Sequence, residues 1–215
     1  MCIRDRVRTD PEAPKHKGIS CLLTSMRTPG ITTRPIVLAS GEPETGEVFF
    51  DDVVVPADQM VGDPGDGWRI AMTTVAFERG ASDVGMIASY RSALQDLQQR
   101  VVDLGLTDRP EVRRALARCY VRGEALRLNA VESLSRRTAG KLPGPESSVG
   151  KLLWSDAEQE LHHLELEVVG ADAFTGAEPD VLSSYFRSRP VSVYGGSSQI
   201  QKNVLAAQIL GMPRG

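Results

Sequence analysis

The sequence predicts an α+β fold in which the end of an antiparallel β-domain, residues 1–60, is followed by an up-and-down four-helix bundle, residues 61–215. Apolar residues alternate with a period of two as far as Pro56, and from Trp68 onward they recur at helical spacing. The few strands that fit before Pro56 cannot close a barrel, so we expect the rest of the sheet upstream of Met1.

Two strands define the β-domain. The first, residues 19–24, places Ile19, Cys21 and Leu23 on one face and ends before a Thr-Pro-Gly turn. The second, residues 47–55, turns its apolar side chains inward around Asp51-Asp52, which we interpret as a charge pair on an edge strand rather than a metal site. Residues 1–6 are charged and without pattern, so we expect them to be non-native, with a strand leaving the sheet from Val7.

Helical signals occupy the rest of the chain. Caps and breakers, with proline at a first turn and glycine after a last turn, set the limits of each helix. The predicted helices are 68–102, 110–138, 147–170, a short one at 179–187, and 198–210. The four long ones have short connections, which is typical of an up-and-down bundle.

Composition excludes several classes of function. A net charge of −3 with scattered basic residues disfavours nucleic acid as a partner. The three cysteines, Cys2, Cys21 and Cys119, lie far apart, which argues against a metal site and against a disulfide framework and favours a reducing, cytoplasmic location. No apolar run approaches the roughly 20 residues needed to span a bilayer.

The stretch from Tyr194 to Gln201, YGGSSQIQ, opens the last helix with two glycines and two hydroxyls. A helix start leaves backbone N–H groups without partners and carries partial positive charge, so glycines there let a phosphate or carbonyl oxygen approach closely. The pattern predicts a small-molecule site. The alternative is a capped helix after a turn, with Ser197 as N-cap.

Glu78 lies on the first long helix among small neighbours at helical spacing, Thr74, Ala81, Ser82 and Gly85. A lane of small side chains around one carboxylate leaves a groove in which a ligand can lie. The alternative is that the small residues only permit close helix packing and that Glu78 is structural.

The span from Val7 to Gly215 resembles the second half of an acyl-CoA dehydrogenase in four motifs that follow the family's order. They are GEVFFDDVVVP at 46–56, GDGWRIAMTTVAFERG at 65–80, VVGADAF at 168–174, and YGGSSQIQ at 194–201 with AAQILGMPR at 206–214. The resemblance implies a flavoprotein that uses FAD to convert an acyl-CoA thioester to a trans-2-enoyl-CoA, in fatty acid β-oxidation or related lipid metabolism.

The resemblance also implies where the base lies. In this family a glutamate removes the proton α to the thioester, and it most often follows the tyrosine of the closing motif, where this chain has Gly195. The other family position precedes an arginine on the first bundle helix, where this chain has Glu78. This pattern is similar to the isovaleryl- and long-chain-type branches and assigns Glu78 as the catalytic base.

Other roles follow from the same resemblance. It implies that Ser197 and Gln199 contact FAD, and that Gly170 and Glu167 meet the flavin of a neighbouring subunit. Substrate contacts are implied for Arg79, Tyr194, Gly195 and Gly196. Glu167 stands where many members have glutamine, and the arginine-phenylalanine-glycine motif expected near residues 100–105 is not legible.

The implied partners are an electron-transfer flavoprotein and further subunits, as a homodimer, a homotetramer or a heterotetramer with a related chain. We expect the isolated chain to bind FAD poorly and to be inactive. Two alternatives remain at this point, a non-catalytic subunit of a heteromeric dehydrogenase and a flavin oxidase or monooxygenase on the same fold.

Residues outside these motifs have ordinary interpretations. His162 and His163 are expected at surface and core-edge positions without a catalytic role, since no cysteine, serine or acid is arranged with them. Trp68 and Trp154 are expected to be packing anchors.

Overall fold

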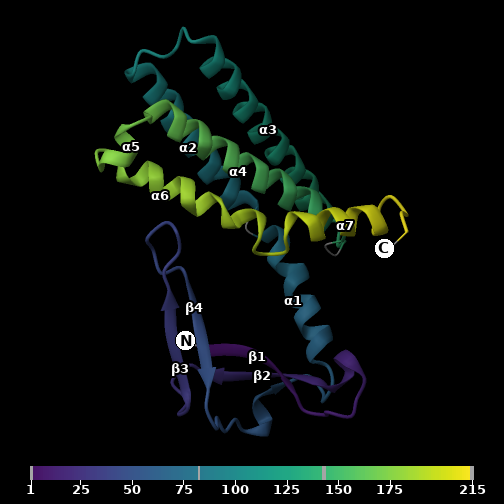
Figure 1. The fold of residues 1–215 in the computed structure, drawn as a ribbon. Helices are drawn as coiled ribbons and strands as arrows, with labels where there is room; N and C mark the ends of the chain where they lie inside the picture. Colours follow the sequence, from purple (N-terminus) through teal and green to yellow (C-terminus); the bar gives the residue numbers. More distant parts are fainter. Residues whose placement is uncertain (1, 82, 142–143, 214–215) are drawn as a thin grey trace. The chain divides into compact units, whose positions relative to one another are not determined.

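The computed structural model describes residues 2–81, 83–141 and 144–213, and the side chains of residues 2, 4, 76–81, 83 and 84 lie outside that description. The chain forms two compact units, Met1–Phe77 and Glu78–Gly215 (Figure 1). The first unit holds the strands and most of one helix, and the second unit is helical.

The first sheet of the β-unit is antiparallel and has three strands, β1 (Cys2–Arg8), β2 (Ile19–Ser25) and β5 (Met60–Val61), in the order β1-β2-β5. β1 pairs with β2 along its whole length, from Cys2 opposite Ser25 to Arg8 opposite Ile19. The strand therefore begins at Cys2 and not at Val7 as predicted, because β2 offers backbone partners to residues that have no apolar pattern of their own.

The predicted strand at residues 19–24 is confirmed as β2, but the face shared by Ile19, Cys21 and Leu23 is not buried along its whole length. Leu23 is 45% exposed, whereas Ser20 and Thr24 are buried. The Ser20 hydroxyl shares a hydrogen bond with the Thr9 hydroxyl at 2.7 Å and accepts one from the Gly65 N–H at 3.1 Å. Burial of these hydroxyls is tolerated because hydrogen-bond partners are supplied.

The second sheet pairs β3 (Ile31–Ile36) with β4 (Thr45–Phe50) in antiparallel register. β4 ends at Phe50, so the strand predicted to continue to Val55 is too long. The Asp51 N–H donates to the Gly30 carbonyl at 2.9 Å, and Asp52 adopts a left-handed φ of 46°. Asp51-Asp52 therefore forms a bend after the strand rather than an edge-strand pair. The 3-10 turns η1 (Lys15–Gly18) and η2 (Ala57–Gln59) complete the β-strand region.

Helix α1 (Gly67–Ala81) opens against β2. A Cβ at Gly67 would lie 2.6 Å from the Ser20 carbonyl carbon, so only glycine allows this approach. Trp68, predicted as a packing anchor, is 42% exposed and stacks on the His16 ring at 3.8 Å instead. α1 and α2 (Asp83–Asp103) cover the predicted helix at 68–102 and flank Ser82, which is outside the described residues.

The helical unit continues with α3 (Pro110–Thr138), α4 (Ser147–Val169), the short α5 (Asp172–Thr175), α6 (Pro179–Ser188), η3 (Pro190–Ser192) and α7 (Ser198–Gln208). α3 packs against both α2 and α4, and α6, η3 and α7 all pack on α4 (Figure 1). The bundle is confirmed, with its fourth position shared by α6 and α7, since α7 has only 11 residues.

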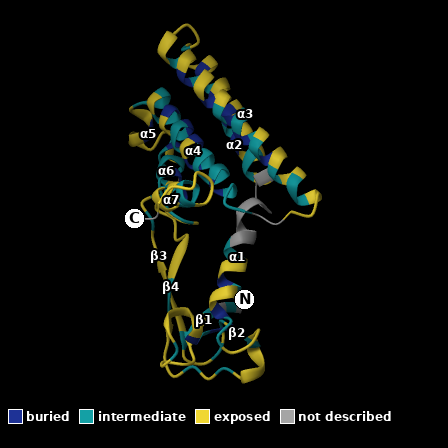
Figure 2. Ribbon diagram, turned by 90° about the vertical axis from the view of Figure 1, so that its right-hand side faces the viewer, coloured by how far each residue is buried: buried dark blue, intermediate teal, exposed yellow. Residues whose placement is uncertain are grey.

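The core of the bundle is made by α2, α3 and α4, whose buried positions are dark blue in Figure 2. Tyr90 is 1% exposed, and its hydroxyl donates to the Cys119 carbonyl at 2.8 Å. Gly123 makes room for the ring, because a Cβ there would lie 2.8 Å from Tyr90 Cε1. The other buried members are Leu94, Leu97, Val101, Ala115, Cys119, Leu126, Ala157, Leu161 and Leu164.

Candidate active site

The predicted site at the start of α7 is a turn made by two glycines, which we call the glycine turn (Tyr194–Ser197). Gly195 and Gly196 have φ values of 65° and 97°, which side-chain-bearing residues rarely adopt. Ser197 caps α7, with its hydroxyl accepting from the Ile200 N–H at 3.4 Å. The N-cap prediction is confirmed, and it leaves the small-molecule prediction open because one residue can cap a helix beside a ligand.

Gln201 supports the glycine turn from inside. Its side chain is fully buried, and Nε2 donates to the carbonyl oxygens of Gly195 and Gly196, both at 3.2 Å. Its Oε1 has no hydrogen-bond partner among the described residues. One buried amide therefore anchors two consecutive peptide groups of the turn.

Helix α4 supports the turn from a second direction. Lys151 donates from Nζ to the Val191 carbonyl and lies 4.8 Å from the centroid of the Tyr194 ring. Ser155 donates to the same carbonyl at 3.2 Å. A Cβ added at Gly195 would lie 3.6 Å from the Lys151 side chain, so Lys151 borders the position to which the resemblance assigns the family's more common base.

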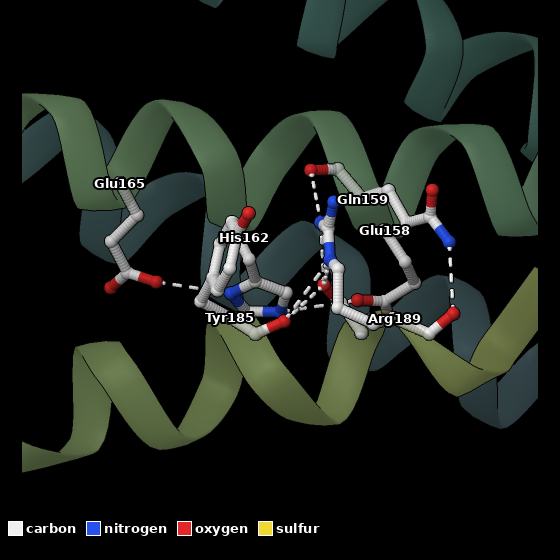
Figure 3. A network of polar contacts seen from close by, with 7 residues as sticks. Glu158, Gln159, His162, Glu165, Tyr185 and Arg189 are labelled. Carbon is white, nitrogen blue, oxygen red and sulfur yellow. Dashed lines mark hydrogen bonds and ion pairs between the residues drawn. The ribbon is translucent and has the colours of Figure 1, made fainter. Parts of the chain in front are cut away.

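The start of η3 is fixed by a polar network between α4 and α6 (Figure 3). Arg189 packs over the Tyr185 ring with its guanidinium carbon 4.4 Å from the centroid, and it donates to the Gln159 carbonyl at 2.8 Å. Gln159 in turn donates to the Arg189 carbonyl at 3.1 Å and to the Ser192 hydroxyl at 3.0 Å. These reciprocal bonds hold the segment that leads into the glycine turn.

His162 belongs to the same region and corrects a prediction. Figure 3 shows it between two acids of its own helix, with Glu158 3.1 Å from Nε2 and Glu165 3.0 Å from Nδ1. Burial alone would lower the pKa of His162, but the hydrogen bonds to Glu158 and Glu165 raise it to about 9. His162 is therefore a partly buried imidazolium, with 16% of its side chain exposed. The prediction that no acid is arranged with it was wrong, although Glu158 and Glu165 stand at helical spacing from it.

The remaining predicted cofactor contacts lie in two places. Gln199 is exposed in the first turn of α7, next to the glycine turn. Gly170 ends α4 with a φ of 65°, and Glu167 in the last turn is exposed and pairs with His163 at 3.4 Å. Gly170 follows Lys151 by 19 residues on or just after the same helix, which corresponds to about 28 Å along its axis. The structure therefore does not bring Gly170 and Glu167 to the glycine turn of the same chain.

The side chains of Glu78 and Arg79 are outside the described residues, so their assigned roles stay predictions. Of their small neighbours, the side chain of Ala81 and all of Ser82 likewise lie outside the description, and a Cβ at Gly85 would meet no atom within 4 Å.

Three supporting residues, Lys151, Gln159 and Gln201, were missed by sequence reasoning. In α7 the apolar residues at helical spacing are more exposed than Gln201, since Ile200 is 54% exposed and Leu210 71% exposed, so apolar spacing does not indicate the buried glutamine. The sequence signal for Gln201 was its position five residues after Gly196 and six residues after Gly195, within reach of both. Lys151 and Gln159 had none, since their partners lie 30 to 40 residues away.

Other kinds of site find no support in the part of the chain that is described. No group of three or more His, Cys, Asp or Glu side chains there is placed to hold a metal ion. No helix there has the length and apolar character to cross a bilayer.

Comparison with known proteins identifies the family. The family model for the acyl-CoA dehydrogenase C-terminal domain matches residues 65–210. Acyl-CoA dehydrogenase IpdE1 of Mycobacterium tuberculosis is 38% identical over 210 residues, covering 96% of this chain and 54% of its own length. Acyl-CoA dehydrogenase FadE34 of the same organism is 36% identical over 96% of this chain and 28% of its own length.

A solved structure agrees with these relatives. The Tcur3481-Tcur3483 steroid ACAD superimposes with a TM-score of 0.84 at 27% identity, over 98% of this chain and 56% of that chain. The chain thus spans about half the length of IpdE1 and of this solved chain. With its glycine turn, its bundle and these matches, the chain belongs to the acyl-CoA dehydrogenase family.

Proposed function

We propose that this chain supplies the bundle part of a flavin-dependent acyl-CoA dehydrogenase in which Glu78 is the catalytic base. The observation that carries the proposal is Gly195, which has no side chain and a left-handed backbone at the position that most often holds the family's base. A member of this family that abstracts a proton needs a carboxylate from elsewhere, and Glu78 occupies the alternative position.

Removal of the α-proton requires a base and hydrogen-bond donors for the thioester oxygen. A proton α to a thioester is weakly acidic, so the base works best when partial burial raises its pKa toward the working pH. Glu78 is proposed to remove that proton. Hydrogen-bond donors must also hold the thioester oxygen as negative charge develops on it, and the backbone N–H groups of the glycine turn are proposed to do so.

FAD fits the same region. The N-terminal end of α7 carries partial positive charge, and Ser197 and Gln199 are proposed to hold the cofactor. In the same helix, Gln201 Oε1 is a buried polar atom with no hydrogen-bond partner among the described residues. When bound, FAD accepts the β-hydrogen as hydride. Arg79, Tyr194 and Gly196 are proposed to border the acyl-CoA.

The separation along α4 supports an assembly of several subunits. Along the axis of α4, Gly170 lies about 28 Å and Glu167 about 24 Å from Lys151, which contacts the glycine turn, so one flavin ring cannot contact both ends of α4 in one chain. We propose that they meet the flavin of a neighbouring subunit in a homo-oligomer or a heterotetramer. An electron-transfer flavoprotein as electron acceptor and a cytoplasmic location belong to the same proposal.

Anaerobic mixing of the holoenzyme with acyl-CoA tests the proposal. The wild-type flavin should bleach, and Glu78→Gln should slow bleaching by at least about a hundredfold, the low end of the usual contribution of a general base. Glu132→Gln, on an exposed position of α3, is the matched control and should bleach at the wild-type rate. Unchanged bleaching in Glu78→Gln would eliminate Glu78 as the base.

A second candidate, a non-catalytic subunit of a heteromeric dehydrogenase, is favoured by the name of the similar solved structure, which joins two proteins in one steroid ACAD. In that case Glu78→Gln would leave the bleaching rate of the assembled complex unchanged. Substitution of the base in the partner subunit would abolish it. The two candidates therefore give opposite results in the same assay.

A further inference from the structure

We propose that Gln201 is a positioning residue that fixes two peptide planes of the glycine turn so that their N–H groups face a bound oxygen atom. The inference rests on the proposed function, because it concerns the same turn. It adds a residue that touches neither substrate nor cofactor and acts through the backbone.

The direction of the N–H groups follows from peptide geometry. The described chain has no cis peptide bond, and in a trans peptide the carbonyl oxygen and the following N–H point in opposite directions. The carbonyls of Gly195 and Gly196 both point at Gln201 Nε2. The N–H groups of Gly196 and Ser197 therefore point away from the buried amide.

These two N–H groups are available. Within the described residues neither donates a hydrogen bond to another group of the chain. Consecutive N–H groups in left-handed and turn conformations form a small concave donor site for anionic or carbonyl oxygen. The capped start of α7 adds its positive dipole end to the same place.

The hydrogen-bonding groups of the Gln201 amide allow only one orientation of the side chain. A primary amide has two N–H donors, and Gln201 directs both at carbonyl oxygens. Rotating the amide by half a turn would place Oε1 against the same two oxygens, which repel it. The buried Gln201 therefore holds one orientation, and a side chain without a donor would release both peptide groups.

The ligand that this turn recognises is a hydrogen-bond-accepting oxygen. It has two possible sources, the carbonyl of the thioester and a phosphate of the flavin cofactor. The two arms of the experiment separate them, since one measures the affinity for FAD and the other measures the affinity for acyl-CoA.

The test uses the holoenzyme with Gln201→Met, which keeps the length of the side chain and removes its donors. Gln208→Met, at an exposed position at the end of the same helix, is the control. We expect Gln201→Met to weaken binding of FAD or of acyl-CoA by about tenfold, as expected for loss of hydrogen bonds at one site. A change in FAD affinity assigns the oxygen to the phosphate, and a change in acyl-CoA affinity assigns it to the thioester.

If Gln201 had only a structural role, Gln201→Met would lower the unfolding midpoint and keep wild-type affinity for both ligands. That result overturns the inference.

Gln201→Glu covers the case in which the methionine variant fails to fold. A protonated carboxyl can donate to one carbonyl, whereas the carboxylate cannot, so ligand affinity should rise as the pH falls in Gln201→Glu and not in the wild type. A flat pH profile also overturns the inference.

Failure of the proposed function has its own signature. If the wild-type enzyme binds FAD but acyl-CoA does not bleach the flavin, the proposed dehydrogenase function is refuted. The effect of Gln201→Met on FAD affinity then still tests the role of Gln201. In this 215-residue chain, NMR should also show slowly exchanging side-chain amide protons for Gln201. Fast exchange at that amide contradicts the geometry whatever the enzyme does.

Discussion

The helical unit and the β-unit differ in how they treat their apolar side chains. In the helical unit, α2, α3 and α4 bury a continuous core that includes Tyr90, Leu97 and Leu161, each 1% exposed. In the β-unit, β4 leaves Phe49 and Phe50 48% and 45% exposed on opposite faces of its sheet. A two-stranded sheet has little stability alone, so the helical unit should carry most of the folding free energy of this chain.

Truncation of a side chain in the helical core should cause the largest loss in the free energy of unfolding. Leu161→Ala is expected to lower the free energy of unfolding of the helical unit by about 2 to 5 kcal/mol, because it removes buried methyl groups and leaves a cavity. Phe49→Ala in β4 should cost less than about 1 kcal/mol. Urea unfolding followed by circular dichroism at the helix signal checks both, and equal losses would contradict the comparison.

The His162 imidazolium should make the stability of the helical unit depend on pH. Its folded pKa of about 9 is above the unfolded value of 6.5, so its contribution is complete below pH 6.5 and is lost as the pH rises through 9. The shift corresponds to a contribution on the order of 3 kcal/mol. His162→Gln should remove most of the difference in unfolding free energy between pH 6 and pH 10.

Exposed His163→Gln is the control for this pH dependence and should leave it unchanged. A wild-type protein equally stable at pH 6 and pH 10, by urea unfolding at both, would show that His162 is not held charged. The assignment of the Glu158–His162–Glu165 cluster as a stabilising group would then fail.

Loss of one buried hydrogen bond should give the smallest of these effects. Tyr90→Phe removes the hydroxyl that donates to the Cys119 carbonyl and should cost about 1 to 2 kcal/mol, because the carbonyl loses its partner. Tyr120→Phe on the exposed side of α3 should cost nothing measurable. Thermal unfolding of the two variants under identical conditions compares them, and equal melting temperatures would contradict the role of Tyr90.

The helix limits could be predicted because local signals set them. Pro110 starts α3, Gly170 ends α4, and Ser197 caps α7, each through chemistry within one turn of the helix. The His162 pair of acids was predictable in the same way, since Glu158 and Glu165 are its helical neighbours.

Features that depend on distant segments could not be predicted. The buried Ser20 hydroxyl has a hydrogen-bond partner in the Gly65 N–H, which lies 45 residues away along the chain. The sequence located the glycine turn, but its support by Lys151 depends on a carbonyl 40 residues further along the chain. Alternation and helical spacing describe one element at a time and carry no information on such pairs.

The central claim is that a glutamate on the first bundle helix replaces the base that is missing at Gly195. The most direct measurement is the structure of the holoenzyme with FAD and a bound acyl-CoA analogue. We expect the Glu78 carboxylate about 3 to 3.5 Å from the α-carbon of the analogue, the usual separation of reacting groups. A Glu78 carboxylate directed into bulk water, away from both the flavin and the thioester, would contradict it.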